Sequence, residues 1–460
     1  MSGKLENDPA AYFDDDVHAA THIPQAQLEA LQLAGLKRRF GEMRDRLPPL
    51  KALADVEGIA SIERFDDIAP LLFPHTFYKS YPAELLEYRR FDAMTRWISR
   101  LTTNDLSAIE SARFDSIDAW LDAMDEQTSV YMLHSTGTTG GLSFMPRGRD
   151  EVAAAHRYLR AIAEWYREPG ADRRVPVIWP GYARGRQAAL RATDHFIHGI
   201  AGSLDNFYAL IDWPMSTDLQ YYQIRINDAA LAGGRPDIEA TPHIRAELDK
   251  IDQLQRSMRQ RTDGYLERIA RDLRGRRVAL AGGPVQIFKF AQEAVEKGYS
   301  DMFAPGTTIS LFGGTKGIAM PEDWLDTVRR FVGDPRLIVT YGMTELCCGS
   351  YRCENNRFHP SPGLIPFVLD IDTGLPLPRS GVQRGRAAYF DLIPRSYWGG
   401  FVSGDRVEID WSPCACGRTS PHFSEDITRC DDDRETRTEI GAVSTAGARA
   451  ALSALNSGLG

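Results

Sequence analysis

The chain has 460 residues, 43% of them hydrophobic and 25% charged, as is typical of a globular protein that is long enough for more than one core. Its net charge of −9 argues against a nucleic-acid-binding surface, which needs a basic face. Because there is no long apolar run and no secretory signal, and only six cysteines, we expect a cytoplasmic protein without a membrane span or a disulfide scaffold.

The first 105 residues are predicted to be a helical lead-in packed on the core. From Gln25 to Phe40, leucines recur at helical spacing, and Pro48-Pro49 is expected to stop this helix. A second amphipathic helix is predicted over 83–101.

Glycines and hydroxyl residues fill positions 135 to 141 of the segment HSTGTTGGLS. Glycine lets the backbone turn tightly, and freed N–H groups with Ser and Thr hydroxyls can bind phosphate oxygens. The segment is not a Walker loop, because no lysine follows its last glycine. A small-residue surface turn is the alternative.

An α/β core is predicted over 106–363. A helix over 150–167, the apolar run VPVIWPG and a long charged helix over 244–274 come first. Three apolar runs that end in glycine follow, separated by helical segments: 278–284, 307–314 and 336–342. Such strand–loop–helix repeats indicate a parallel sheet, in which ligands bind where strands end in loops.

The composition of the chain changes at residue 364. Short β-like runs separated by glycine and proline predict a small β subdomain over 364–432. Residues 433–460 are rich in alanine, serine and glycine, and we expect a short tail or frayed helix.

Four further motifs accompany the loop at 135–141: GGTKG at 313–317, TYGMTE at 340–345, SGD at 403–405 and ITRCDD at 427–432. In this order and at these separations, the set resembles the adenylate-forming superfamily of acyl-CoA synthetases, and most of all its phenylacetate–CoA ligases and the acyl-protein synthetases of bacterial luminescence. The resemblance implies an α/β fold: a large adenylate-forming N-terminal domain and a small β subdomain, with the mobile C-terminal domain missing or truncated. It also implies ATP-dependent adenylation of an aromatic or acyl carboxylic acid, with release of pyrophosphate.

The resemblance implies roles for single residues. The phosphate loop would comprise Ser135, Thr136, Gly137, Thr138, Thr139 and Gly140. The adenine would meet Gly313, Gly314 and Tyr341, the ribose would meet Asp405 and Arg429, and Gly342 would also belong to the nucleotide site. The catalytic residues would be Lys316, Thr344 at the α-phosphate and Glu345 as a ligand of Mg²⁺, and Asp431 would be the hinge. Leu142-Ser143 replaces the family's usual Pro-Thr or Pro-Lys, and Lys316 could equally be a surface lysine.

The cysteines form a second pattern. Cys353, His359, Cys414 and Cys416 can supply four nitrogen and sulfur ligands to a tetrahedral, structural Zn²⁺, as in some phenylacetate–CoA ligase relatives. Buried cysteines without a metal are the alternative, and Cys347 and Cys348 are candidate replacement ligands.

The acceptor of the acyl group is left open. CoA, a carrier protein and an amine are all compatible with the motifs, and a homodimer is one possible assembly. The short segment after the hinge holds no lysine, so an acyl-protein synthetase-like subunit that loads itself or a partner is an alternative. Cys430 at the hinge is a conceivable acceptor. A non-catalytic nucleotide-binding scaffold is the third hypothesis.

Overall fold

The computed structural model describes residues 5, 8–9, 11–13, 17–110, 114–137, 141–165, 173–234, 240–315, 318–430 and 442–459, without the side chains of 162–165. The chain forms two compact units. Unit 1 combines Met1–Tyr158 with Thr344–Gly460, and unit 2 is Leu159–Met343. The division into four segments that the sequence predicts, 1–105, 106–363, 364–432 and 433–460, stays a prediction.

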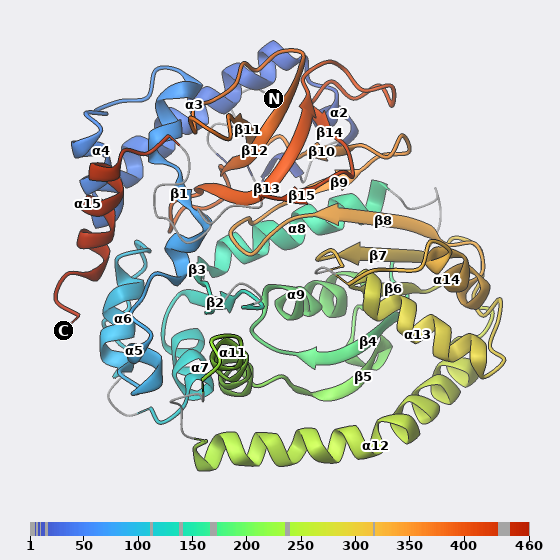
Figure 1. Ribbon diagram of the computed structural model, residues 1–460. Coiled ribbons are helices and arrows are strands. Elements are labelled where there is room, and N and C mark those ends of the chain that lie inside the picture. The colour runs from blue at the N-terminus through green and yellow to red at the C-terminus, as the bar shows by residue number, and fades with distance from the viewer. Residues whose placement is uncertain are drawn as a thin grey trace. The chain divides into compact units, whose positions relative to one another are not determined.

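Unit 2 is built on a five-stranded parallel sheet in the order β8-β7-β6-β4-β5, as the strand–loop–helix repeats predicted (Figure 1). Its strands are β4 (Val177–Arg184), β5 (Phe207–Pro214), β6 (Ala279–Gly282), β7 (Thr308–Phe312) and β8 (Arg336–Tyr341). Its helices are α9 (Ala188–Arg191), α10 (Thr193–His195), η5 (Phe196–Ala201), η6 (Leu204–Asn206), α11 (Thr217–Leu231), α12 (Pro242–Leu273), α13 (Pro284–Glu296) and α14 (Trp324–Val332).

Helices cover both faces of this sheet. Side chains of a strand alternate between its faces, so Ile178 and Leu280 join one cluster with α12, α13 and α14, while their neighbours Val177 and Ala279 join another with η5. Burial on both faces explains why β4 and β6 read as continuous apolar runs.

The N-terminal part of unit 1 is mainly helical. Its elements are η1 (Ala11–Phe13), α2 (Val17–Thr21), α3 (Gln25–Met43), α4 (Pro48–Val56), η2 (Phe65–Leu71), η3 (His75–Lys79), α5 (Glu84–Glu87), α6 (Phe91–Ser99) and α7 (Ile117–Gln127). The helix predicted from Gln25 is confirmed, but Pro48 begins the next helix, where a missing N–H costs nothing. The helix predicted over 83–101 is wrong as one piece, because Arg89 adopts a left-handed conformation with φ 54° between α5 and α6.

The β part of unit 1 centres on β13 (Gly400–Asp410), which pairs with four other strands. Its strands pair antiparallel in the order β11-β12-β13-β14-β10-β9, and two of them, β9 and β10, precede residue 364. The strands are β1 (Phe73–Pro74), β9 (Ser350–Arg352), β10 (Phe358–Pro360), β11 (Leu364–Leu369), β12 (Val382–Asp391), β14 (His422–Phe423) and β15 (Thr428–Arg429). A separate hairpin, β2 (Val130–His134) and β3 (Phe144–Gly148), leads into α8 (Arg149–Trp165).

The C-terminal segment forms a helix, α15 (Thr445–Asn456), which agrees with the helical alternative of the prediction. It packs against α4, and Leu455 is fully buried. Ser444 caps the helix, and its own N–H donates to Glu57 at the end of α4. Buried apolar side chains along one face and the Ser444 cap stabilise this alanine-rich segment as a helix.

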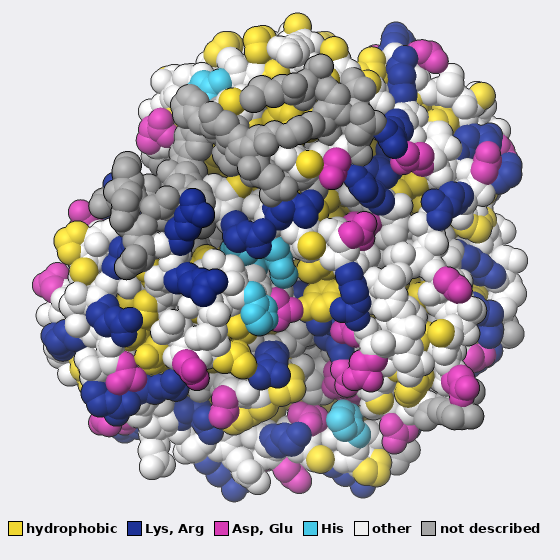
Figure 2. Space-filling model, turned by 180° about the vertical axis from the view of Figure 1, so that it is seen from behind, with side chains coloured by type: hydrophobic (Ala, Val, Ile, Leu, Met, Phe, Trp, Pro, Cys, Tyr) yellow, Lys and Arg dark blue, Asp and Glu magenta, His cyan; other side chains and the backbone are white. Residues whose placement is uncertain are grey.

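Two further features of the described residues concern membrane-spanning helices and surface charge. No helix in the described part of the chain is both long and apolar enough to cross a membrane. Figure 2 shows basic and acidic side chains interspersed among the described residues of one face.

Candidate active site and metal centre

The glycine-rich segment connects β2 to β3, and hydrogen bonds fix both of its ends. The Ser135 N–H donates to the Ser143 carbonyl at 3.0 Å, and the Ser143 N–H donates to the Ser135 hydroxyl at 3.0 Å. Gly137 and Gly141 have φ angles of 70° and 63°, which other residues rarely adopt. Thr136 is described as well, whereas Thr138, Thr139 and Gly140 lie outside the described residues. The two hydrogen bonds between Ser135 and Ser143 therefore hold the ends of the segment together.

Glu345 is a buried carboxyl group in unit 1, only 8% exposed. Burial raises its pKa to about 7, against the opposing effects of its own backbone N–H and of the positive charges of Arg147, Lys79 and Arg429. A carboxyl with this pKa ionises near neutrality, and it can hold a hard cation such as Mg²⁺ once ionised. Thr344, directly before it, is partly buried.

Asp405 and Arg429 are opposite each other on the paired strands β13 and β15. The Arg429 Nη1 lies 3.0 Å from Oδ1 of Asp405. The Asp405 N–H also donates to the Ser403 hydroxyl at 3.1 Å, a local hydrogen bond within the SGD motif on β13. A carboxylate and a guanidinium held side by side can accept from and donate to neighbouring hydroxyl groups.

The short helix η3 links these parts of unit 1. It packs against β3, which leaves the glycine-rich loop, and against β13, which carries Asp405. Its last residue, Lys79, and Arg429 both act electrostatically on Glu345. Burial, and after it the charges of Lys79 and Arg429, lower the pKa of His75 to about 4, so this imidazole is neutral. Unit 1 thus gathers the loop stem, Glu345 and the Asp405–Arg429 pair around a set of cations.

His75 and Lys79 were not predicted from the sequence. They lie in a five-residue 3₁₀ segment without periodicity, and no motif marks them. The only available signal was their position directly after SIERFDDIAPLLFP, a stretch that resembles a connection in phenylacetate–CoA ligases.

The predicted adenine-binding residues belong to unit 2 and occur at one edge of its sheet. Gly313 and Gly314 follow β7 with φ angles of 80° and 59°, and Tyr341 ends the neighbouring strand β8 before Gly342. Ligand-binding loops of parallel sheets occur at this carboxyl edge. Lys316 and the predicted hinge residue Asp431 lie outside the described residues.

Comparison with known proteins agrees with this arrangement at the level of fold. No family model and no curated protein matches the sequence. A solved structure of 2-hydroxyisobutyryl-CoA ligase in an open conformation, in complex with 2-HIB-AMP and CoA, matches with a TM-score of 0.53 and 13% identity, over 91% of this chain and 74% of that one. The same enzyme in the postadenylation state, in complex with R3-HIB-AMP, matches with a TM-score of 0.51 and 14% identity, over 91% and 72%. The chain has the fold of the adenylate-forming acyl-CoA ligases.

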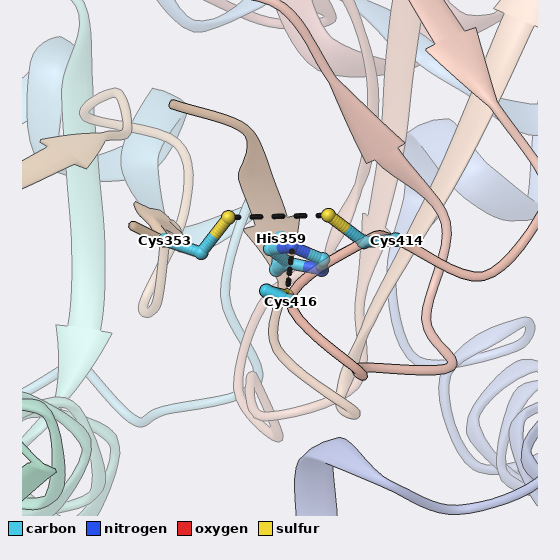
Figure 3. Close-up of side chains that lie close together, drawn as sticks. All are labelled: Cys353, His359, Cys414 and Cys416. Carbon is cyan, nitrogen blue, oxygen red and sulfur yellow. Dashed lines mark hydrogen bonds between the residues drawn. The ribbon is translucent and has the colours of Figure 1, made fainter. Parts of the chain in front are cut away.

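Within this ligase fold, unit 1 contains a compact cluster of metal-binding side chains (Figure 3). The ligand atoms of Cys353, His359, Cys414 and Cys416 all lie within 4.8 Å of one another. The sulfurs of Cys353 and Cys414 are 4.0 Å apart, and the sulfur of Cys416 is 3.5 Å from His359 Nε2. Tetrahedral Zn²⁺, with Zn–S of about 2.3 Å and Zn–N of about 2.0 Å, separates two sulfurs by about 3.8 Å and sulfur from nitrogen by about 3.5 Å. These two separations are close to those in the cluster, so the donor set suits zinc.

Two similar turns present these ligands. The N–H of Cys353 donates to the Arg357 carbonyl, and the N–H of Cys414 donates to the Arg418 carbonyl. The third residue after each cysteine, Asn356 in one turn and Gly417 in the other, has a positive φ, of 55° and 88° respectively. The two turns thus have the same hydrogen-bond spacing and a positive φ at the same position after the cysteine.

The surroundings of the cluster also suit a zinc ion. The second ring nitrogen of His359 lies 3.0 Å from the Ser420 hydroxyl, which leaves Nε2 for a metal. Burial, then the charge of Arg418, lower the pKa of His359 to about 3, so the ring is neutral. A zinc ion with three thiolates and one imidazole carries a net charge of −1, and Arg418, which is 1% exposed, is a buried positive charge beside it.

The other cysteines have different surroundings. Cys347 contacts the Tyr397 hydroxyl and Cys348 contacts the Ser361 hydroxyl, and neither belongs to the metal-binding group. Burial raises the pKa of both thiols. Cys430 is 3% exposed, which is unfavourable for a residue that would accept an acyl group.

Proposed function

We propose that this protein uses ATP to activate a carboxylic acid as an acyl-adenylate, with release of pyrophosphate. The observation that carries the proposal is the environment of Glu345, a buried carboxyl that shares unit 1 with the glycine-rich loop and is acted on by Lys79, Arg147 and Arg429. Several cations around a single carboxyl leave an excess of positive charge. The phosphates of a bound nucleotide would balance this charge.

The reaction needs no covalent intermediate with the protein. A carboxylate oxygen of the acid attacks the α-phosphorus of ATP, and the bond from that phosphorus to the bridging oxygen breaks, so that pyrophosphate leaves with the electron pair. Repulsion between the carboxylate and the phosphates is the main obstacle, and positioned cations and N–H donors reduce it. In this chain we assign that role to Lys79, Lys316, Thr344 and the loop from Ser135 to Gly140.

The remaining site residues would bind the nucleotide. Asp405 has two carboxylate oxygens for the ribose hydroxyls, and Arg429 is held beside it. Gly313, Gly314 and Tyr341 would meet the adenine. Glu345, once ionised, would hold Mg²⁺, which neutralises phosphate charge when it is bound.

The second half-reaction is proposed only by class. The activated acyl group would pass to a thiol or an amine, with CoA and a carrier protein as the candidate thiols. For 2-hydroxyisobutyryl-CoA ligase, the solved complex contains CoA. Self-loading on Cys430 is disfavoured by the burial of that thiol.

We also propose that Cys353, His359, Cys414 and Cys416 bind a structural Zn²⁺. Four protein ligands leave no open position for substrate, so the ion would join the β9–β10 hairpin to the turn at 414–418 and would take no part in the chemistry.

The test is acid-dependent ATP–pyrophosphate exchange with a panel of aromatic and aliphatic acids. Exchange with at least one acid is expected, with a loss of about 10²-fold or more in Glu345→Gln and Asp405→Asn. Glu408→Gln is the matched control, because Glu408 is an exposed carboxylate on the same strand as Asp405. An absence of exchange with every acid, or full exchange in both site variants, would refute the proposal.

A further inference from the structure

The segment that carries Glu345 is held in an unusual way. Residues Thr344 to Cys348 form neither helix nor strand. Their backbone groups bond instead to buried side chains of unit 1 that are distant in sequence. The conformation of this segment, and with it the direction of the Glu345 side chain, therefore depends on a few side chains.

Two of these side chains bind three consecutive carbonyl groups. Arg147 Nη2 donates to the Thr344 carbonyl at 2.7 Å and also to the Leu346 carbonyl. Between them, the carbonyl of Glu345 itself accepts from the Tyr397 hydroxyl at 3.2 Å. Arg147 is 8% exposed, and Tyr397 is fully buried.

A third side chain binds the N–H groups that follow. Oδ2 of Asp391, the last residue of β12, accepts from the N–H of Cys347 at 2.7 Å and from that of Cys348 at 3.3 Å. Its other oxygen accepts from the Ile393 N–H at 2.9 Å. The segment is therefore bound from both sides, by donors on its carbonyls and by an acceptor on its N–H groups.

From these contacts we infer that Arg147 and Tyr397 are positioning residues for Glu345, which fix the carboxylate in the orientation needed to hold the metal of a metal–ATP complex. The inference rests on the proposed function. By donating to the Thr344 and Leu346 carbonyls, the Arg147 guanidinium restrains the 344–345 and 346–347 peptide groups. The Tyr397 hydroxyl, which donates to the carbonyl of Glu345, restrains the 345–346 peptide group between them. Preorganisation of this kind acts on a reaction without contact with the substrate.

A positioning role differs from a merely structural role in what it changes. Misplacement of Glu345 should weaken the contribution of the metal to ATP binding and leave metal-free ATP binding unchanged, because adenine and ribose contacts lie elsewhere. General loosening of the fold should weaken both. The ratio of the ATP dissociation constants without and with Mg²⁺ therefore separates the two roles.

The experiment measures this ratio by calorimetric titration with ATP, in EDTA and in saturating Mg²⁺, for four proteins. These are the wild type, Tyr397→Phe, Arg147→Met and Tyr158→Phe. Tyr158 is the matched control, since its buried hydroxyl also donates to a carbonyl of this region, that of Gly349, four residues beyond Glu345. Tyr397→Phe keeps the aromatic ring and so tests the inference even where Arg147→Met does not fold.

We expect the ratio to fall roughly tenfold in Tyr397→Phe and about 10²-fold in Arg147→Met, with the metal-free affinity of Tyr397→Phe and the ratio of Tyr158→Phe as in the wild type. An unchanged ratio in both variants overturns the inference, and so does an equal loss in Tyr158→Phe. Neither result touches the proposed function. That function fails instead if the wild type binds no ATP under either condition and exchanges pyrophosphate with no acid.

Discussion

Glu345→Gln should remove the activity of the protein and at the same time stabilise the free protein above neutral pH. The glutamine side chain has nearly the same shape as the carboxyl group and carries no charge at any pH. Glu345 is buried, so its ionised form is disfavoured in the folded state and not in the unfolded one.

The size of the effect follows from the pKa of Glu345, which is raised from 4.5 to about 7. Below pH 4.5 the carboxyl is protonated in both states and its ionisation has no effect on stability. Between the two pKa values the unfolded state releases the proton and the folded state retains it, so stability falls as the pH rises. Above pH 7 the folded state carries the full cost of a buried charge, about 3 kcal/mol.

Thermal unfolding of wild type and Glu345→Gln at about pH 5 and about pH 8 tests this reasoning. For a chain of 460 residues, about 3 kcal/mol corresponds to roughly 3 °C in the unfolding midpoint. The midpoint of the variant relative to wild type should therefore rise by about this amount between the two pH values. Glu408→Gln, at an exposed carboxylate, should show no such change. A constant difference at both pH values would show that Glu345 is not a buried group of raised pKa.

Three further predictions concern other parts of unit 1. Lys79→Ala should weaken ATP binding by about tenfold, measured by calorimetry, whereas Lys51→Ala, at an exposed ion pair with Asp55, should leave it unchanged. Purified protein should contain one equivalent of zinc by mass spectrometry, and Cys414→Ser should lose the ion and lower the unfolding midpoint; a wild type free of zinc would contradict the cluster. Leu455→Ala should destabilise the protein by about 2–5 kcal/mol in urea unfolding, because the Leu455 side chain of α15 is fully buried. A change below about 0.5 kcal/mol would mean that α15 does not pack on α4.

The sequence predicted those parts of the fold that local periodicity determines. The glycine-terminated apolar runs around β6, β7 and β8 indicated a parallel sheet, because strands that alternate with helical segments pair in parallel. It did not predict the break at Arg89, where a left-handed residue interrupts a continuous apolar pattern. It also missed the docking of α15, which depends on a partner helix almost 400 residues earlier.

The residues of the candidate site likewise fall into those that the sequence predicted and those that it missed. Glu345 and Asp405 were found because they belong to motifs of fixed spacing. Lys79 and Arg147 were missed because their importance comes from partners that the fold brings near, 197 residues away in the contact of Arg147 with Thr344. The candidate zinc ligands could be named despite their separation in sequence, because few residue types bind zinc.

The pairing of β1 with β13 has a consequence for the synthesis of the protein. Phe73 pairs with Phe401, so β1 leaves the ribosome about 330 residues before its partner. At roughly 5–20 residues per second, this delay is on the order of tens of seconds. Unit 2 is continuous in sequence and can fold during that time. The apolar residues in the N-terminal part of unit 1 stay exposed to aggregation until β13 has been synthesised. Nascent chains stalled before residue 400 should therefore bind chaperones through their N-terminal segment.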